Sequence, residues 1–311
     1  MAVIDKKGVL HGSVSNIVYR SWRDLNVVQM KPHKVKQTLS SKEASLEFGL
    51  CSSTARIIRK AFKWAYKGYD GAMINRCTSA VRKAVSASAK ERGERDIHDG
   101  DMSFLKGFQF NNNSPLDKVL RVRASAQLSQ DKKVSIHLPA VTINDIKGCN
   151  AAYYILRFTV VAFDFRSRVF SYVSTKDIKI GSRDSYAGGN IELDEVVPEG
   201  RLVAVSMSIH AYDQVFIGEM ETTNSSQRSP AELLNVWQLP LPETSDAMQT
   251  PKSDAVKTSE RDWIFDYEGP QMLMKIAELR DKAVKLTKPS AKLTVSLNKS
   301  GPGLPKGDIK F

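Results

Sequence analysis

Residues 154–162 read YILRFTVVA, with an apolar side chain at every second position from Tyr154 onward. Residues 203–211, VAVSMSIHA, repeat this alternation with small or polar residues between the apolar ones. A period of two places successive side chains on opposite sides of a strand, and strands with one apolar and one polar face are typical of antiparallel sheets. We therefore expect burial between sheets for Leu156, Phe158, Val205 and Met207.

Shorter alternating segments surround these two. Residues 120–128 and 134–138 alternate on either side of the turn-like sequence SQDK at 129–132, and residues 169–173 form a further short apolar run. Several short strands separated by turns favour a sandwich of two antiparallel sheets. The sequence therefore predicts a β-sandwich domain over residues 101–240.

The N-terminal part begins with a predicted β-hairpin over residues 13–32. Residues 13–22 are rich in β-formers, residues 23–26 (RDLN) supply turn chemistry, and residues 27–30 return. Pro32 has no N–H to donate and is expected to end the pairing.

The next segments have a helical period. Ser40 and Glu43 have the spacing of a capping box, which predicts a helix over residues 41–67 with Gly68 after its end. Asp70 is expected to cap a second helix over residues 71–90. A short link between two helices favours antiparallel packing.

The C-terminal part is predicted to contain one helix between two irregular segments. Residues 241–259 read as a linker, residues 269–286 as a helix, and residues 288–311 as a basic flexible tail. The fold class is therefore α+β: an N-terminal hairpin plus two-helix unit (1–100), an antiparallel β-sandwich (101–240), and a linker, C-terminal helix and tail (241–311).

The positive charge of the chain is concentrated at its N-terminal end. Residues 1–100 hold 19 Lys+Arg against 9 Asp+Glu, whereas residues 101–240 hold 15 against 15 and residues 241–311 hold 12 against 10. A basic surface on one part of a protein favours an anionic partner for that part. Nucleic acid or an acidic protein is expected.

The residues expected to bind anions lie on one face of the first helix, on the second helix and in a basic arm. They are Arg56, Arg59, Lys60, Lys63, Lys67, Arg82, Lys83, Lys31, Lys34 and Lys36. Trp64 and Tyr66 lie near the first group and are candidates for stacking on bases. The alternative is a solvated helix face whose aromatic side chains pack on the hairpin.

The sequence contains no nucleotide-binding glycine motif, no H-E-x-x-H and no G-x-S-x-G, so no catalytic residue, metal or cofactor is assigned. His98-Asp99-Gly100-Asp101 and the acidic residues at 192–199 are interpreted as solvated loops, and His137 and His210 as exposed strand residues. The three cysteines show no disulfide framework or metal pair, and buried free thiols are expected. With no apolar run long enough for a membrane helix and no secretory signal, a cytoplasmic protein is expected.

The N-terminal stretch also resembles a known sequence pattern. Residues 12–19 (GSVSNIVY), followed by Trp22, Val27, Pro32, Lys34, Lys36 and Thr38, are similar to the opening of an uncharacterised bacterial domain family, whose pattern is G-x-x-G-x-x-V-x-x-x-W-(K/R)-G and then V-x-R-x-x-P. Ser15 and Asp24 stand where that family has Gly, and Gln29 stands where it has Arg. The resemblance implies two helices, a β-sandwich and a final hairpin over residues 209–218. It implies no activity.

These observations favour a non-enzymatic binding protein whose basic N-terminal part engages an anionic partner, with nucleic acid as the first candidate. The alternative is a structural or self-assembly protein, a homo-oligomer in which strand edges pair between copies.

Overall fold

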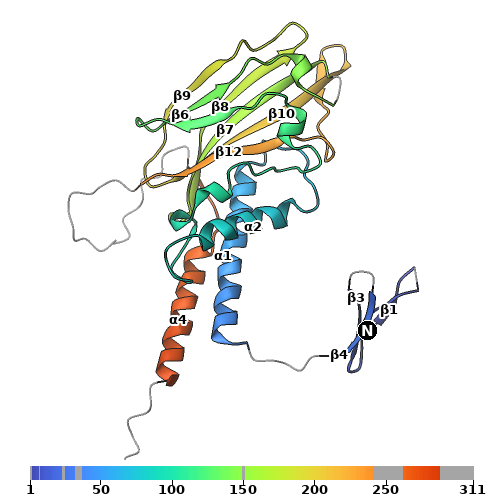
Figure 1. Ribbon diagram of the computed structural model, residues 1–311, viewed down its shortest axis with the longest axis vertical. Coiled ribbons are helices and arrows are strands. Elements are labelled where there is room, and N and C mark those ends of the chain that lie inside the picture. The colour runs from blue at the N-terminus through green and yellow to red at the C-terminus, as the bar shows by residue number, and fades with distance from the viewer. Residues whose placement is uncertain are drawn as a thin grey trace, which may run out of the picture. The chain divides into compact units, whose positions relative to one another are not determined.

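The computed structural model describes residues 2–6, 8–22, 25–31, 37–148, 151–240 and 262–287, with the side chains of 194 and 285–287 excepted. The chain divides into two compact units, Met1–Ser45 and Leu46–Phe311. Helices and mostly antiparallel sheets are present, as the α+β prediction requires (Figure 1). Four sequence predictions lie outside the described residues: the linker at 241–259, the tail at 288–311, Cys149, and Pro32 with Lys34 and Lys36.

The first unit contains a four-stranded antiparallel sheet in chain order. Its strands are β1 (Ala2–Ile4), β2 (Leu10–Val14), β3 (Ile17–Trp22) and β4 (Leu25–Met30). The predicted N-terminal hairpin is present as β3 and β4, in which Trp22 lies opposite Leu25. The strands β1 and β2 extend it, with a turn at Ser15, whose φ is 50°. None of the described residues in these strands is buried.

The second unit is built on a six-stranded antiparallel sheet. It contains β7 (Tyr153–Asp164), β8 (Val169–Gly181), β10 (Leu202–Phe216), β11 (Glu219–Thr222), β12 (Ala231–Gln238) and β13 (Asp262–Ile264). The order is β11-β10-β7-β8-β13, with β12 also paired to β10. The two long alternating stretches of the sequence are the central strands β7 and β10, and Phe158 lies opposite Met207 between them.

A three-stranded sheet shares a core with one face of the larger sheet. Its strands are β5 (Ser125–Leu128), β6 (Lys133–Leu138) and β9 (Gly189–Val196), in the order β5-β6-β9. The predicted burial of Leu156, Phe158, Val205 and Met207 is confirmed, because all four are fully buried in this core. The predicted acidic loop at 192–199 is wrong in part: residues 192–196 belong to β9, where alternate side chains enter the core and Glu192 and Glu195 are exposed.

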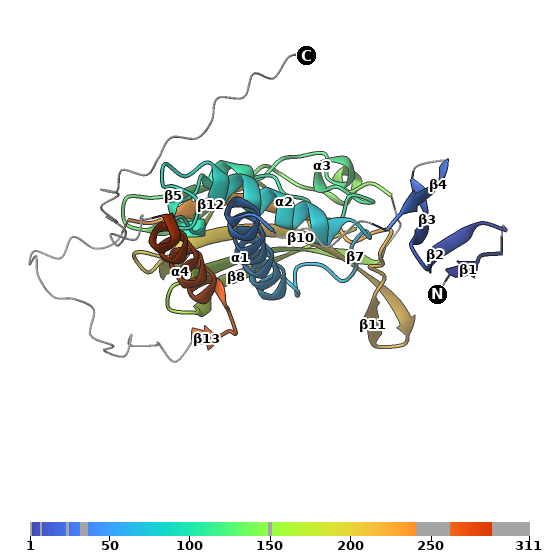
Figure 2. The same ribbon diagram turned by 90° about the horizontal axis from the view of Figure 1, so that it is seen from below.

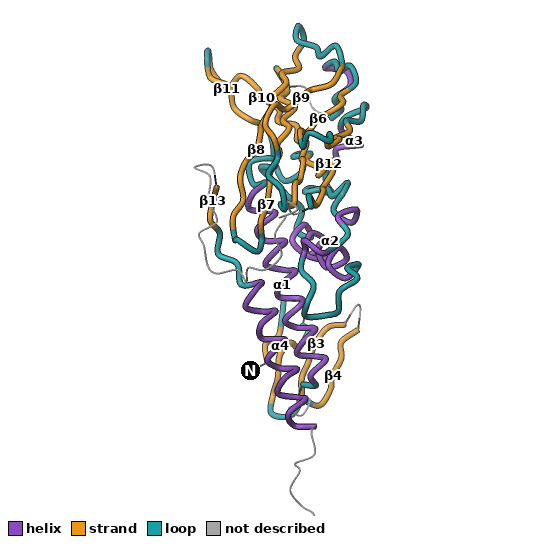
Figure 3. Tube along the Cα trace, turned by 90° about the vertical axis from the view of Figure 1, so that its left-hand side faces the viewer, coloured by secondary structure: helices purple, strands orange, loops and turns teal. Residues whose placement is uncertain are grey.

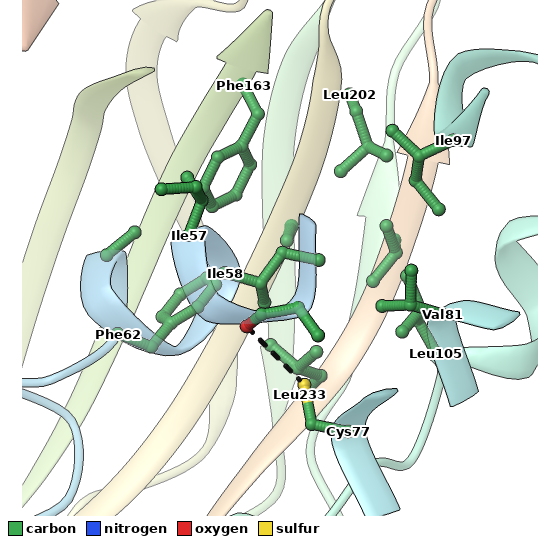
Figure 4. Packing of buried hydrophobic residues seen from close by; sticks show 14 of the residues in the cluster. Ile57, Ile58, Phe62, Cys77, Val81, Ile97, Leu105, Phe163, Leu202 and Leu233 are labelled. Atoms are coloured by element: carbon green, nitrogen blue, oxygen red, sulfur yellow. Dashed lines mark hydrogen bonds between the residues drawn. The ribbon is translucent and has the colours of Figure 1, made fainter. Parts of the chain in front are cut away.

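The other face of the large sheet is covered by helices. Val161 and Phe163 of β7, and Phe165 just after this strand, belong to a second core. The helical part of the chain contributes Ile57, Phe62 and Val81 to it. Figure 4 shows Ile57, Ile58 and Phe62, in and just after the last turns of α1, clustered with Phe163 and Leu233 of the sheet. Residues on both sides of the predicted division at residue 100 belong to this core as well, since it contains Ile97 and Met102. The helical segments after residue 45 therefore pack with the sheets.

The two helices differ from their predicted geometry. Helix α1 (Leu39–Ala61) begins after Thr38, whose hydroxyl accepts the N–H of Ser41 at 3.2 Å, so the predicted cap at Ser40 is wrong. It ends at Ala61, and residues 62–72 form a link before α2 (Met73–Ser86). This link is longer than the predicted one, which comprised only residues 68–70. Helix α2 crosses α1 instead of lying antiparallel along it (Figures 1 and 2).

Short helical turns connect these parts: η1 (Ile97–Asp99), η2 (Met102–Phe104), α3 (Leu116–Val119) and η3 (Ile143–Asp145). The predicted C-terminal helix is present as α4 (Gly269–Thr287), which lies beside α1 (Figures 1 and 3). The hydroxyl of Tyr267 lies 3.0 Å from that of Thr54, which connects the start of this segment to α1. No helix in the described ranges is long and apolar enough to cross a membrane.

Candidate anion-binding site

The site lies where α1 ends. Beyond Ala61 the chain makes tight turns, and Phe62 and Tyr66 enter the core that α1 shares with the sheet. The residues between and after them, Lys63, Trp64 and Lys67, are therefore exposed. Gly68 follows, and an added Cβ there would lie 2.5 Å from the backbone nitrogen of Ser226. This close approach fixes the chain against the loop after β11 and holds the exposed residues in place.

These side chains line a hollow of about 620 Å³ in the second unit. One wall comes from α1 and the link after it, and the other from β7 and β10. The lining residues are Arg56, Arg59, Lys60, Lys63, Trp64, Tyr66, Lys67, Tyr69, Arg157, His210 and Tyr212. Six of these side chains are Lys or Arg, four are Trp or Tyr, and none is a carboxylate.

The cations of the hollow differ in how they are compensated. Arg157 makes two hydrogen bonds with the carboxylate of Asp177, at 2.8 and 2.6 Å. Within the part of the chain that the structure describes, no ion pair joins a carboxylate to any of the other five, Arg56, Arg59, Lys60, Lys63 or Lys67. Arg56 donates to the carbonyl of Asp266 at 2.9 Å, which connects α1 to the segment before α4. Nη1 of Arg59 is buried without a hydrogen-bond partner among the described residues.

His210 forms part of the sheet wall and is buried, so its predicted exposure is wrong. It lies on the side of β10 that faces α1, and its Nε2 is 3.0 Å from the hydroxyl of Ser208. Burial lowers the pKa of His210 to about 4, and the positive charges of Arg157 and Lys67 act in the same direction against the smaller opposing effect of Asp177. The imidazole is therefore neutral at pH 7, and the excess charge of the hollow comes from Lys and Arg.

The aromatic side chains are not equally available to a ligand. Tyr66 stacks on Phe110 with ring centroids 4.8 Å apart and donates its hydroxyl to the carbonyl of Arg59, so its predicted role in stacking on bases is not supported by its packing. Tyr212 stacks on Tyr153 at 5.2 Å. Trp64 is 73% exposed and Tyr69 is 48% exposed. The most exposed rings of the hollow are therefore Trp64 and Tyr69, and Tyr69 contacts Tyr66 edge-to-face with ring centroids 6.2 Å apart.

The structure separates the predicted anion-binding residues into groups. Arg56, Arg59, Lys60, Lys63 and Lys67 share the hollow. Arg82 and Lys83 are exposed on α2 and do not line it, and Lys31 belongs to the first unit. The hollow also contains residues that sequence reasoning missed, and Arg157 had a visible signal, because it interrupts the apolar strand sequence 154–162.

The histidine at 98 and the cysteines, which the sequence analysis also considered, contribute to the packing of the fold. His98 is buried, where its Nε2 accepts the N–H of Phe165 at 3.0 Å and its Nδ1 lies 2.8 Å from Oε1 of Gln238, so the predicted solvated loop at 98–101 is wrong for this residue. No group of three or more metal-ligating side chains occurs among the described residues. Cys51 and Cys77 are buried free thiols, as predicted, and burial raises their pKa values to about 12 and about 11. Figure 4 shows Cys77 in the core, with its Sγ 3.8 Å from the carbonyl of Ala55.

Comparison with known proteins leaves the site to be interpreted from its own geometry. No protein-family model matches the chain, and no curated protein has a matching sequence.

Proposed function

We propose that this protein is a non-enzymatic binding protein whose hollow at the end of α1 engages an anionic partner, with nucleic acid as the leading candidate. The observation that carries the proposal is the group of five Lys and Arg side chains that line one hollow without a carboxylate partner among the described residues. Cations left unpaired and close together repel one another, and a bound polyanion removes that repulsion.

The shape of the charge distribution favours a phosphate backbone. Lys60 lies in the last turn of α1, and Lys63 and Lys67 follow it in the link, so three successive cations line one wall of the hollow. Phosphates repeat along a nucleic acid strand, and contacts to them give affinity without sequence information. A non-enzymatic role is supported by Ser208, the hydroxyl beside His210: it is fully buried, so a substrate cannot reach it as a nucleophile.

The test is equilibrium binding of a labelled 12-nucleotide single strand at low salt, measured by fluorescence anisotropy. The double variant Lys63→Gln, Lys67→Gln should weaken binding at least about tenfold, since each charged contact contributes on the order of 1 kcal/mol or more. The matched control is Arg82→Gln, Lys83→Gln, which removes the same charge from α2 and should change affinity less than about twofold. Equal losses in the two variants, or no binding by the wild type, would contradict the proposal.

A second candidate function, self-assembly, is favoured by the sheet of the first unit. Its four strands contain no buried residue among those described, although large apolar side chains such as Val3, Trp22, Leu25, Val28 and Met30 are exposed on it. Isolated small sheets without a core are marginal in water, and an unpaired edge such as β4 is a template for another strand. Light scattering should then give a species larger than a monomer that Val28→Lys, Met30→Lys converts to a monomer; a monomeric wild type would remove this candidate.

We also infer that the six-stranded and three-stranded sheets are the two layers of the predicted β-sandwich. This is supported by the core that Phe158 and Met207 of the large sheet share with Ile136 and Ile191 of the small one. Phe158→Ala should lower the free energy of unfolding by about 3–5 kcal/mol in chemical denaturation. A loss below about 1 kcal/mol would contradict the assignment.

A further inference from the structure

The aromatic side chains of the hollow indicate which form of nucleic acid it takes. A binding site for phosphates alone needs cations at the surface, as on α2. This hollow instead has a volume of about 620 Å³, which is in the range of sites for organic molecules, and four aromatic side chains line it. A ligand that fills it must offer flat apolar surface as well as negative charge.

Two of the rings have the free faces that such a ligand needs. Trp64 is 73% exposed and Tyr69 is 48% exposed, whereas Tyr66 is packed against Phe110. Trp64, Lys63 and Lys67 line the same hollow, so a ring that stacks on Trp64 is near two cations. The bases of a duplex are stacked on one another, and their faces are not available to a protein ring. The bases of a single strand are available and alternate with phosphates along the chain.

We propose that the hollow holds an unpaired stretch of single-stranded nucleic acid, with a base stacked on Trp64 and the neighbouring phosphates on Lys63 and Lys67. The inference rests on the proposed function and adds the class of ligand. The sheet wall, with His210 and Tyr212, closes the hollow behind the base. The Arg59 guanidinium, which has no carboxylate partner among the described residues, adds positive charge at the same wall as Lys63.

The experiment compares three labelled 12-mers that carry the same number of phosphates per strand: a thymidine single strand, its duplex, and a strand in which abasic sites replace the central nucleotides. The wild type should bind the thymidine strand at least about tenfold more tightly than either of the others. Trp64→Ala should weaken binding of the thymidine strand by about 5- to 150-fold, the range expected for one stacked base, and leave the abasic strand within about twofold.

The control variant is Trp263→Ala, which removes another exposed tryptophan, 61% exposed on β13, and should change neither affinity. Equal binding of all three probes by the wild type, or equal effects of Trp64→Ala on the thymidine and abasic strands, would overturn the inference. If Lys63→Gln, Lys67→Gln still weakens binding of the oligonucleotides at least about tenfold in that case, the proposed anion site is retained. Binding of polyglutamate but of no oligonucleotide would overturn the inference and identify an acidic protein as the partner class.

Discussion

The hollow at the end of α1 and the corner around η1 both contain several Lys and Arg side chains, but among the described residues most of these charges have a carboxylate partner only at the corner. At the corner, Lys90 lies 2.8 Å from Asp99, Arg95 lies 2.6 Å from Glu47, and Arg166 lies 2.8 Å from Asp96. At the hollow, five Lys and Arg side chains have no carboxylate partner among the described residues. Cations of the first kind are neutralised within the fold, whereas those of the second kind keep a positive charge that no described carboxylate compensates. The count of basic residues along the chain does not distinguish the two.

Of these two regions, the corner should show the larger effect on stability. Arg95 makes two hydrogen bonds to Glu47, at 2.6 and 3.2 Å, and this contact raises the pKa of the guanidinium. The pair is largely buried, with side-chain exposures of 13% and 10%. Removing Arg95 leaves the buried carboxylate of Glu47 with the more distant Arg92, at 3.4 Å. Arg95→Gln should therefore lower the free energy of unfolding by about 3 kcal/mol in urea, the low end of the range for breaking a buried pair. Oligonucleotide affinity should be unchanged. A loss below about 1 kcal/mol would contradict the contrast between the two regions.

The next effect concerns His210, which lies against the hollow near Arg157, Lys67 and Asp177. Its pKa is lowered from 6.5 to about 4 in the folded state, mainly by burial. As the pH falls from about 6.5 toward 4, the unfolded chain takes up a proton that the folded chain does not, so stability is lost across this window. The loss from this residue is on the order of 3 kcal/mol.

Denaturation curves at pH 7 and pH 4.5 measure this loss, and His210→Asn isolates it from the titration of carboxylates. The difference in stability between the two pH values should be smaller in the variant than in the wild type. An identical pH dependence would show that His210 is not held in its neutral form.

The smallest expected effect on stability is at the hollow itself. Lys63→Gln, Lys67→Gln removes two exposed charges that lack carboxylate partners among the described residues, so the free energy of unfolding should change by less than about 0.5 kcal/mol. The same variant should raise the pKa of His210, because Lys67 is one of the charges that lower it. Denaturation and the proton NMR titration of His210 measure the two effects. A loss of stability comparable to that of Arg95→Gln would mean that these lysines are structural.

The sequence predicted the secondary structure and burial of segments in which a single hydrophobic period dominated. The alternation at 154–162 and 203–211 predicted the strands β7 and β10 and the buried face that contains Phe158 and Met207. It did not reveal that the opposite face is also covered at His210, because a serine- and histidine-containing face looks solvated until the helix that covers it is known. The strand β12 has residues in both cores, so it shows little alternation and was not predicted.

The candidate site was predictable in part. The row Lys60, Lys63, Lys67 follows from helical spacing, but α1 ends at Ala61 and the row continues along a tight link. Arg157 and Tyr212 come from strands about 90 and 140 residues away in the chain, and only the packing of α1 on the sheet brings them to the same hollow. The packing of Tyr66 on Phe110 could not be predicted, because the two residues are distant in sequence.

The most direct test of the account is the salt dependence of single-strand binding by the wild type and by the triple variant Lys60→Gln, Lys63→Gln, Lys67→Gln. Each phosphate neutralised on a single strand contributes roughly 0.7 to the slope of the logarithm of affinity against the logarithm of salt concentration. The account predicts a slope shallower by about 2 in the triple variant, with the fold unchanged. Equal slopes for the two proteins would contradict it, because the hollow would then not be where the anion binds.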